Sequence, residues 1–432
     1  MSEKKIPFSD ALIRQVAEKY GTPFHIYDEK GMLDNVKRLQ KAFSWAPDFH
    51  EYFAVKATPN PWLMKSLKTL HVGADCSSMA ELVLSETVGL KGEEIVFSSN
   101  DTPDEEFKKA YELGAIINLD DISNLEDMER LNMVPERICF RYNPGPDVAK
   151  GNAIIGRPEE AKYGMTHEQL MACIDWAKEK KISYIGIHTM IISAELELSG
   201  LLGTIAMMFD LANEIREKKG VTVSFIDFGG GIGIPYRPEQ TAVDLEGLGE
   251  GAKKLYEEKM KGFEKTRICF ECGRMITGPY GFLVSKAIHY KHIYRDYIGL
   301  DACMADLMRP GMYGAYHYIS VLGKEDAPKD HVYDVTGSLC ENCDKFAIQR
   351  ELPEIEMGDL VVIHDTGAHG HSMGYNYNGR LRHQEILVKE DGTIQQIRRN
   401  ETLSDLFATL DFPGLEENMK KIDDCGSRQE IR

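Results

Sequence analysis

Short apolar runs alternate with amphipathic stretches through the first two thirds of the chain. Eight of these runs predict buried β-strands: Glu51–Val55, Val72–Asp75, Glu94–Phe97, Ala115–Leu119, Arg137–Arg141, Tyr184–His188, Ser224–Phe228 and Arg267–Glu271. Four of the intervening stretches carry apolar residues at helical spacing: Ala80–Thr87, Glu105–Glu112, Glu168–Lys180 and Thr204–Lys218. Strands buried on both faces and joined through helices pair in parallel by right-handed crossovers. The pattern therefore predicts an α/β fold, a TIM-like (β/α)₈ barrel.

The pattern changes beyond residue 280. Further strand-like runs are Leu283–Tyr294, His331–Val335, Asp359–Asp365 and His383–Arg399, and Lys389-Glu390-Asp391-Gly392 has the composition of a hairpin turn. We expect a barrel over residues 32–280 and a second, mostly β domain over residues 281–432. The pattern alone leaves open which domain the N-terminal segment, residues 1–31, joins.

Composition narrows the possible partners. The net charge is −18 and no long basic run occurs, which argues against nucleic acid and anionic membrane surfaces as partners. No uninterrupted apolar stretch reaches the ~18 residues of a membrane span, and no signal peptide is visible behind Met1–Lys5. Nine cysteines, an odd number spread over 432 residues, do not resemble a disulfide framework. We therefore expect a cytoplasmic protein.

The first predicted strand leads directly into Lys56. A lysine at a strand end is usually a solvated surface residue. Here the run Phe53-Ala54-Val55 is apolar, so the lysine would project into the mouth of the barrel. Desolvation or nearby positive charge would lower its pKa, which suits a lysine that forms a Schiff base.

The seventh predicted strand leads into Gly229-Gly230-Gly231-Ile232-Gly233. The simplest structural interpretation of this segment is a tight turn between a strand and a helix. Neither the dinucleotide fingerprint nor the Walker A sequence fits, because position 234 is Ile and no Gly-Lys-Ser/Thr follows. Four glycines in five residues exceed what a turn needs, and they favour backbone binding of a phosphate.

The eighth predicted strand ends in Glu271-Cys272-Gly273-Arg274. Glu271 and Arg274 could be a structural ion pair. With Lys56 and the glycines, however, a buried acid supplies the groups that hold pyridoxal 5'-phosphate, the acid facing the pyridine nitrogen. Asp75 and His188 also fall at strand carboxyl ends, the face where barrel enzymes bind their ligands.

Other motifs are weaker by themselves. Cys340-Glu341-Asn342-Cys343 is a single C-x-x-C without the second pair that zinc would need, so we predict no metal. Arg309-Pro310-Gly311-Met312-Tyr313 and Asn376-Tyr377-Asn378 are loop-like and, without other context, predict a polar seam between domains.

Taken together, these motifs resemble the diaminopimelate decarboxylases, in the fold-type III group of pyridoxal phosphate enzymes that also holds ornithine and arginine decarboxylases. The resemblance runs in order from Tyr20-Gly21-Thr22-Pro23 to Tyr377-Asn378. It implies that residues 1–31 join the β domain. It also implies a homodimer whose active sites are completed by the cysteine-bearing loop of the other subunit.

The resemblance also implies residue roles. Lys56 would form the Schiff base, Glu271 would pair with the pyridine nitrogen, and Cys340 would donate the proton. The remaining cofactor residues would be Asp75, His188, Ser193, Gly229, Gly230, Gly231, Gly233, Gly273, Arg274 and Tyr377. The substrate residues would be Arg274, Arg309, Tyr313, Glu341 and Tyr377.

Several positions depart from the family pattern. Met190 stands where a histidine usually stacks on the cofactor ring, and a thioether can pack there but cannot titrate. Cys272 replaces a proline, His369 a tyrosine, and Asn342-Cys343 a Ser-Gly pair.

The favoured hypothesis is decarboxylation of meso-diaminopimelate to L-lysine and CO₂, because two arginines suit a substrate that keeps a second carboxylate. One alternative is a related decarboxylase of another amino acid. A second is a pyridoxal phosphate-binding protein without turnover, which the Cys340-Glu341 pair argues against. A racemase has no need for that pair.

Overall fold

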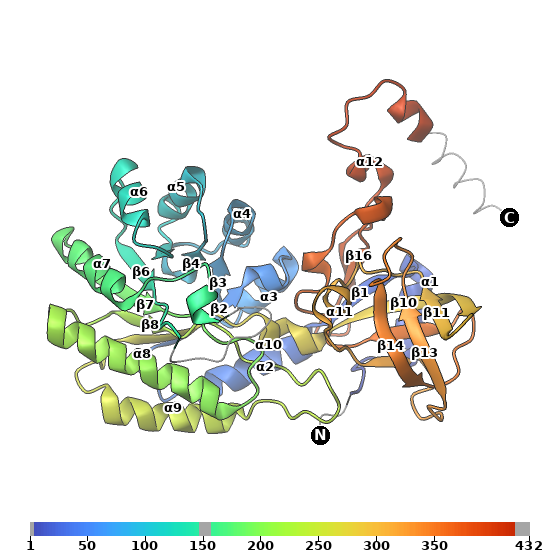
Figure 1. Ribbon diagram of the computed structural model, residues 1–432, viewed down its shortest axis with the longest axis horizontal. Helices are drawn as coiled ribbons and strands as arrows, with labels where there is room; N and C mark the ends of the chain where they lie inside the picture. Colours follow the sequence, from blue (N-terminus) through green and yellow to red (C-terminus); the bar gives the residue numbers. More distant parts are fainter. Residues whose placement is uncertain (1–3, 147–156, 420–432) are drawn as a thin grey trace.

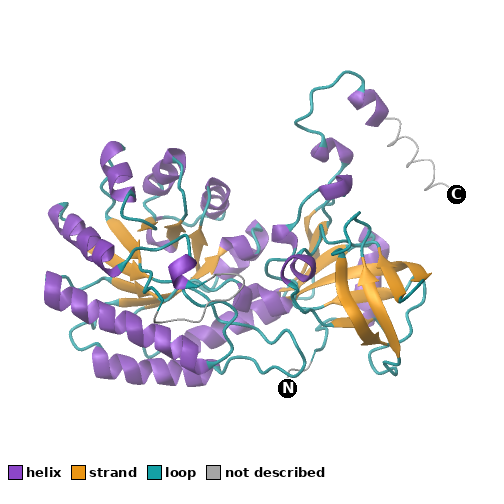
Figure 2. Cartoon of the chain, viewed as in Figure 1, coloured by secondary structure: helices purple, strands orange, loops and turns teal. Residues whose placement is uncertain are grey.

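The computed structural model describes residues 4–146 and 157–419, which form two lobes (Figure 1). One lobe is a barrel ringed by helices, and the other is built mainly of strands (Figure 2). The C-terminal segment leads away from the second lobe through the short helix α12 (Leu403–Leu406).

Eight parallel strands close the barrel, because the first pairs with the last through Phe49 and Ile268. They are β2 (Phe49–Ala54), β3 (Gly73–Cys76), β4 (Ile95–Ser98), β5 (Ile116–Leu119), β6 (Arg137–Arg141), β7 (Tyr184–His188), β8 (Phe225–Asp227) and β9 (Arg267–Phe270). The predicted barrel is confirmed, and each strand lies within two residues of its predicted position.

The helices of this lobe lie outside the strands (Figure 2). They are α2 (Glu29–Ala42), α3 (Pro61–Lys68), α4 (Met79–Thr87), α5 (Asp104–Glu112), α6 (Asn124–Arg130), α7 (His167–Glu179), α8 (Leu198–Lys219), α9 (Leu245–Lys259) and α10 (Arg274–Thr277). Among the described helices, α8 alone has the length and the hydropathy, 1.2, of a possible membrane span. Here α8 packs between α7 and α9, as the outer helix of a barrel does.

The interior of the barrel is filled in layers by side chains that point inward at every second position. The lower layer is a buried apolar cluster of Tyr52, Val96, Ile116, Cys139, Phe225 and Cys269. Gly186 makes room for Phe225, since a Cβ on the glycine would lie 2.1 Å from the ring. This apolar layer fills the lower part of the barrel and is the floor on which the residues at the carboxyl ends of the strands lie.

The second lobe is a sheet in the order β14-β13-β11-β10-β1-β16-β17, with β15 joining β10 to β12. Its strands are β1 (Phe24–Asp28), β10 (Gly281–His292), β11 (Asp296–Leu300), β12 (Ile319–Val321), β13 (His331–Thr336), β14 (Lys345–Leu352), β15 (Leu360–Ile363), β16 (Gln384–Val388) and β17 (Ile394–Arg398). Two further helices flank it, α1 (Asp10–Tyr20) and α11 (Arg309–Tyr313).

The predicted hairpin is present between β16 and β17, where Lys389 donates its N–H to the Thr393 carbonyl and Gly392 takes φ +82°. The strand β1 lies between β10 and β16. The N-terminal strand therefore belongs to the same sheet as the C-terminal hairpin. The eight cysteines among the described residues are all unpaired.

Candidate active site

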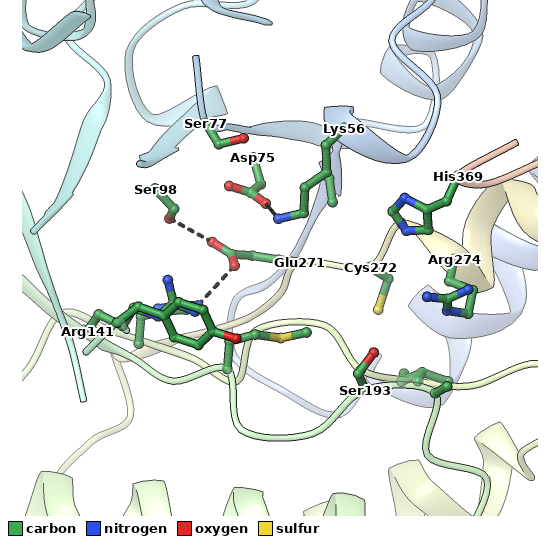
Figure 3. A pocket seen from close by; sticks show the side chains of 18 of the residues that line it. Lys56, Asp75, Ser77, Ser98, Arg141, Ser193, Glu271, Cys272, Arg274 and His369 are labelled. Carbon is green, nitrogen blue, oxygen red and sulfur yellow. Dashed lines mark hydrogen bonds and ion pairs between the residues drawn. The ribbon is translucent and has the colours of Figure 1, made fainter. Parts of the chain in front are cut away.

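A polar layer lies directly above the apolar floor of the barrel. In each strand the next inward-facing residue lies two positions after the one in the lower layer. This residue is polar in seven of the eight strands, and in β2 it is Ala54. The seven polar residues are Asp75, Ser98, Asn118, Arg141, His188, Asp227 and Glu271. Above them opens a cavity of about 300 Å³ (Figure 3). The carboxyl-end position matches the face where barrel enzymes carry out their chemistry.

Lys56 follows β2 in a short 3₁₀ turn and reaches into this cavity (Figure 3). Its side chain is 58% exposed, and its Nζ lies 3.7 Å from Oδ2 of Asp75. The Asp75 carboxyl raises the pKa of Lys56 above its usual value, because its charge outweighs the partial desolvation of the amine inside the cavity. The lowered pKa that the sequence predicts is wrong for this arrangement, because the nearest charged partner of Lys56 is an acid.

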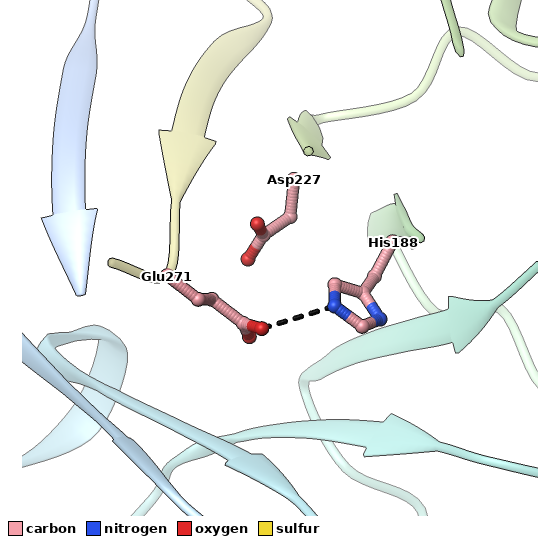
Figure 4. Close-up of side chains that lie close together, drawn as sticks. All are labelled: His188, Asp227 and Glu271. Atoms are coloured by element: carbon pink, nitrogen blue, oxygen red, sulfur yellow. Dashed lines mark ion pairs between the residues drawn. The ribbon is translucent and has the colours of Figure 1, made fainter. Parts of the chain in front are cut away.

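Glu271 is held in its ionised form at the floor of the cavity. Its Oε2 lies 3.0 Å from Nε2 of His188 (Figure 4), and Ser98 donates its hydroxyl to Oε1 at 3.3 Å. Burial alone would raise the pKa of Glu271, but the His188 imidazole and the more distant Lys56 lower it to about 2. The site therefore presents a buried carboxylate at neutral pH.

Asn118 fixes the orientation of His188. Its amide nitrogen donates to Nδ1 of His188 at 3.0 Å, so the imidazole proton lies on Nε2 and faces Glu271. The third acid here, Asp227, accepts the N–H of Gly229 at 2.8 Å, and burial raises its pKa well above the usual range. His188, Asp227 and Glu271 have ligand atoms within 4.8 Å of one another (Figure 4). Glu271 and His188 form an acid–imidazole pair, and Asp227 accepts a backbone N–H.

The glycine-rich loop is packed so tightly that side chains are excluded. A Cβ at Gly229, Gly230 or Gly231 would lie 2.4–2.6 Å from a carbonyl oxygen of the loop after β7 or of Glu271. Gly233 is equally close to Ala194. Gly229 and Gly231 also take φ of +67° and +90°, which favours glycine. The glycines therefore let this loop pack directly against the loop after β7 and against Glu271, and Gly231 lines the cavity with backbone alone.

The loop after β7 forms the opposite wall. Ser193 and Met190 both line the cavity, and the Met190 sulfur lies 3.3 Å from the Gly230 nitrogen, accepting its N–H. This places the thioether beside the glycine loop.

Arg274 and Arg309 come together through a residue that the sequence analysis missed. Each donates Nη1 to the hydroxyl of Tyr236, at 2.7 Å and 2.8 Å. Arg274 lines the cavity, while Arg309 is 5% exposed and belongs to the second lobe. The described structure therefore brings the two predicted substrate arginines into one cluster. Tyr313 ends the same short helix as Arg309 and is 36% exposed.

Cys340, Glu341 and Tyr377 lie elsewhere on the second lobe. None of the three lines the cavity. The N–H of Cys340 is donated to Asn378 Oδ1 at 2.8 Å, and a hydrogen bond to Glu341 raises the pKa of Tyr377. Cys340 and Tyr377 are exposed. Within one chain, these three predicted residues are therefore grouped with each other and apart from Lys56.

Two further departures from the family pattern, besides Met190, face the cavity. Cys272 is buried in its wall, and its backbone N–H is donated to Oε1 of Glu51 at 2.8 Å. His369 lies beside Arg274 (Figure 3), and burial together with the charge of the two arginines lowers its pKa well below the usual value. His369 is therefore neutral at physiological pH.

Comparison with known proteins gives a consistent result. Residues 31–278 match the pyridoxal-binding domain of the pyridoxal-dependent decarboxylases. Protein TabA of Pseudomonas amygdali pv. tabaci is 39% identical over 91% of this chain and 92% of its own length. The diaminopimelate decarboxylase of Methanothermobacter thermautotrophicus is 34% identical over 92% and 94%, respectively.

Solved structures agree with this likeness. A diaminopimelate decarboxylase from M. jannaschii superposes with a TM-score of 0.84 and 30% identity, over 93% of this chain and 95% of that one. A diaminopimelate decarboxylase from Helicobacter pylori, complexed with L-lysine, superposes with a TM-score of 0.83 and 29% identity, over 92% of this chain and 98% of that one.

The residues of the cavity fit pyridoxal 5'-phosphate. Gly231 and Gly273 line the cavity with backbone alone, and a Cβ on Gly231 would lie 2.6 Å from the Ile192 carbonyl oxygen. Glu271 offers an ionised carboxylate, and Lys56 supplies a primary amine within the same cavity. Phosphate, pyridine nitrogen and aldehyde would each have a matching group.

Proposed function

Because the chain belongs to the pyridoxal-dependent decarboxylase family of fold type III, which includes the diaminopimelate decarboxylases, we propose that it converts meso-diaminopimelate into L-lysine and CO₂. The observation that carries the choice of substrate is the pair of guanidiniums joined at Tyr236. A substrate that loses one carboxylate and keeps another needs such a cationic site for the group that stays.

When bound, pyridoxal phosphate withdraws electrons from Cα of an attached amino acid and stabilises the charge left by the departing CO₂. The chain's own residues prepare this. Lys56 holds the cofactor through its amine. The glycine loop would hold its phosphate at Gly231, which lines the cavity, with Ser193, Gly273 and Arg274 beside it. The N–H groups of Gly229, Gly230 and Gly233 are donated to Asp227, Met190 and the Glu195 carbonyl instead. Glu271, ionised and oriented by His188, keeps the pyridine nitrogen protonated.

The proton that replaces the carboxylate at Cα has to come from a positioned acid. We assign this to Cys340, with Glu341 and Tyr377 beside it. Because all three lie apart from Lys56 within one chain, we propose a homodimer in which Cys340 of the partner subunit reaches the cavity. The exposure of Cys340 and Tyr377 supports this arrangement, since an interface would cover them. We place this enzyme in the cytosol.

A second candidate is decarboxylation of a different amino acid by the same machinery. It is favoured by Met190, which lines the cavity where the family pattern has a histidine.

Release of CO₂ from a panel of amino acids decides between the two. The panel is meso-, L,L- and D,D-diaminopimelate, L- and D-lysine, and L-ornithine. We expect kcat/KM to be highest for meso-diaminopimelate, with L-lysine as product. Preference for a substrate without a distal carboxylate would contradict the proposal and select the second candidate.

A further inference from the structure

Tyr236 lies where one arginine from each lobe meets the other, and of these three residues Arg274 lines the cavity. Tyr236 follows the glycine loop of the barrel, as Arg274 follows β9, while Arg309 begins α11 in the second lobe. The guanidinium carbon of Arg309 also lies 4.7 Å from the centre of the Tyr236 ring. The guanidinium carbon of Arg274 lies 5.9 Å from the same centre, so one phenol side chain contacts both cations by a hydrogen bond and by its ring face.

The two arginines are held by neutral groups. No carboxylate forms an ion pair with either guanidinium among residues 4–146 and 157–419. Asp365, whose pKa is affected by the charge of Arg309, forms an ion pair with Lys4 at 2.6 Å instead. A buried guanidinium, that of Arg309, beside the half-buried guanidinium of Arg274 is costly without an anion, so this cluster is prepared for an anionic ligand.

His317 provides the other acceptor for Arg309. Its Nδ1–H is donated to the carbonyl of His364 at 2.8 Å, which leaves Nε2 to accept from Arg309 Nη1 at 3.1 Å. His317 is fully buried, and burial with the charge of Arg309 lowers its pKa to about 3. It therefore fixes the direction of Arg309 without cancelling its charge.

A tyrosine hydroxyl has two lone pairs and one proton. In Tyr236 both lone pairs accept from the arginines. The hydroxyl proton has no acceptor in the part of the chain that the structure describes. We propose that Tyr236 donates this proton to the ligand carboxylate that Arg274 and Arg309 bind, and so acts as a third binding residue that selects substrates with a distal carboxylate. This inference rests on the proposed function for the identity of the carboxylate.

The test compares L-lysine with cadaverine, which differ only by that carboxylate. Both are titrated as competitive inhibitors of the holoenzyme, in the wild type and in Tyr236→Phe, which keeps the ring and its stacking on Arg309. We expect the inhibition constant of L-lysine to rise about tenfold, as for a lost hydrogen bond to a charged group, and that of cadaverine to stay within about twofold. KM for meso-diaminopimelate should rise similarly while kcat changes little.

Tyr316→Phe is the matched control. The Tyr316 ring also contacts two arginines, Arg237 at 4.3 Å and Arg350 at 4.0 Å, but through its face. Removing the Tyr316 hydroxyl should leave the ratio of the inhibition constants of L-lysine and cadaverine unchanged. The visible spectrum of the bound cofactor checks that each variant is folded and loaded.

Equal losses for both inhibitors in Tyr236→Phe, or no loss for L-lysine, would overturn the proposal. If that variant does not load with cofactor, fluorotyrosine at position 236 of the wild type replaces it. The ¹⁹F resonance should then move with L-lysine and stay in place with cadaverine, and the reverse result counts against Tyr236. Should the wild type release no CO₂ from meso-diaminopimelate yet discriminate the inhibitors through Tyr236, the proposed function fails and this inference stands.

Discussion

At the scale of single residues, the protonation states of the site follow from burial and immediate neighbours. Glu271 stays ionised because the His188 imidazole and Lys56 outweigh desolvation, whereas Asp227 has only a backbone N–H and its pKa rises. Sequence position predicted that acids would gather here. It could not predict which of them is charged, because that depends on Asn118 and His188, which lie on other strands.

Lys56→Ala should remove covalent attachment of the cofactor, because the described cavity has no other lysine in its lining. The purified variant should lack the visible absorption band of the wild type and release no CO₂. Lys65→Ala, an exposed helix position, is the control and should keep both. A Lys56→Ala protein that retains the band, with borohydride fixing the cofactor to another lysine, would refute the assignment.

Met190→His should be tolerated and should alter the cofactor spectrum, because the side chain lines the cavity beside Gly230. An imidazole titrates near neutrality where a thioether does not. The spectrum of the variant should therefore gain a pH dependence between about 5 and 8. An unchanged spectrum across this range would place Met190 away from the cofactor.

Because of His25, we expect the free energy of unfolding to fall in acid. His25 is fully buried, faces His371, Asp306, Glu385 and His383, and burial lowers its pKa to about 3. The unfolded chain binds this proton near pH 6.5, so the stabilisation is complete above that pH and is lost as pH falls toward 3. Urea unfolding at pH 7 and 5 should show a smaller acid loss in His25→Leu than in the wild type. Parallel losses would contradict the assignment.

At the scale of elements, the strands of the barrel could be predicted because each is an apolar run ending in a functional residue type. In the second lobe β1, β11, β12 and β14 were missed. In β11 and β14 several side chains are partly or fully exposed, so these strands lack a continuous apolar signal. β12 has only three residues, and β1 is a buried run of five that His25 interrupts. Tyr236 carried no local signal at all, since its partners are far away in sequence and meet it only after both lobes form.

The polar layer of the barrel, by contrast, left a signal that could have been found. Ser98, Asn118 and Arg141 are polar residues in otherwise apolar strands, each two positions after an inward-facing residue. Reading the period of two across all eight strands would have placed them in the site.

The glycine loop gives a prediction at this scale. Gly230→Ala should destabilise the protein by about 2–3 kcal/mol and weaken cofactor binding, because its Cβ would lie 2.4 Å from the Glu271 carbonyl oxygen. Gly203→Ala on α8 is the matched control, with nothing within 4 Å of its Cβ. It should stabilise by about 0.5–1 kcal/mol. Thermal unfolding and cofactor titration measure both, and equal effects would refute the steric argument.

At the scale of the whole molecule, one chain separates the proposed acid Cys340 from Lys56. If subunits share sites, mixing Lys56→Ala with Cys340→Ala should restore activity, because each mixed dimer contains one site with both residues intact. Random reassortment predicts about a quarter of wild-type activity. Each variant alone is the control. Mixtures that stay as inactive as the separate variants, after exchange is verified by mass, would show that each site is built from one chain.

The pairing of β1 also fixes an order of events during synthesis. Phe24 lies opposite Gln384, so the strand emerges from the ribosome 360 residues before its parallel neighbour. At translation speeds of about 5–20 residues per second, that interval is roughly 20–70 seconds. All eight barrel strands are complete by Phe270 and can close during the wait. β10 can cover one edge of the N-terminal strand soon after the barrel is complete. The other edge stays open, exposed to other nascent chains, until β16 has been made.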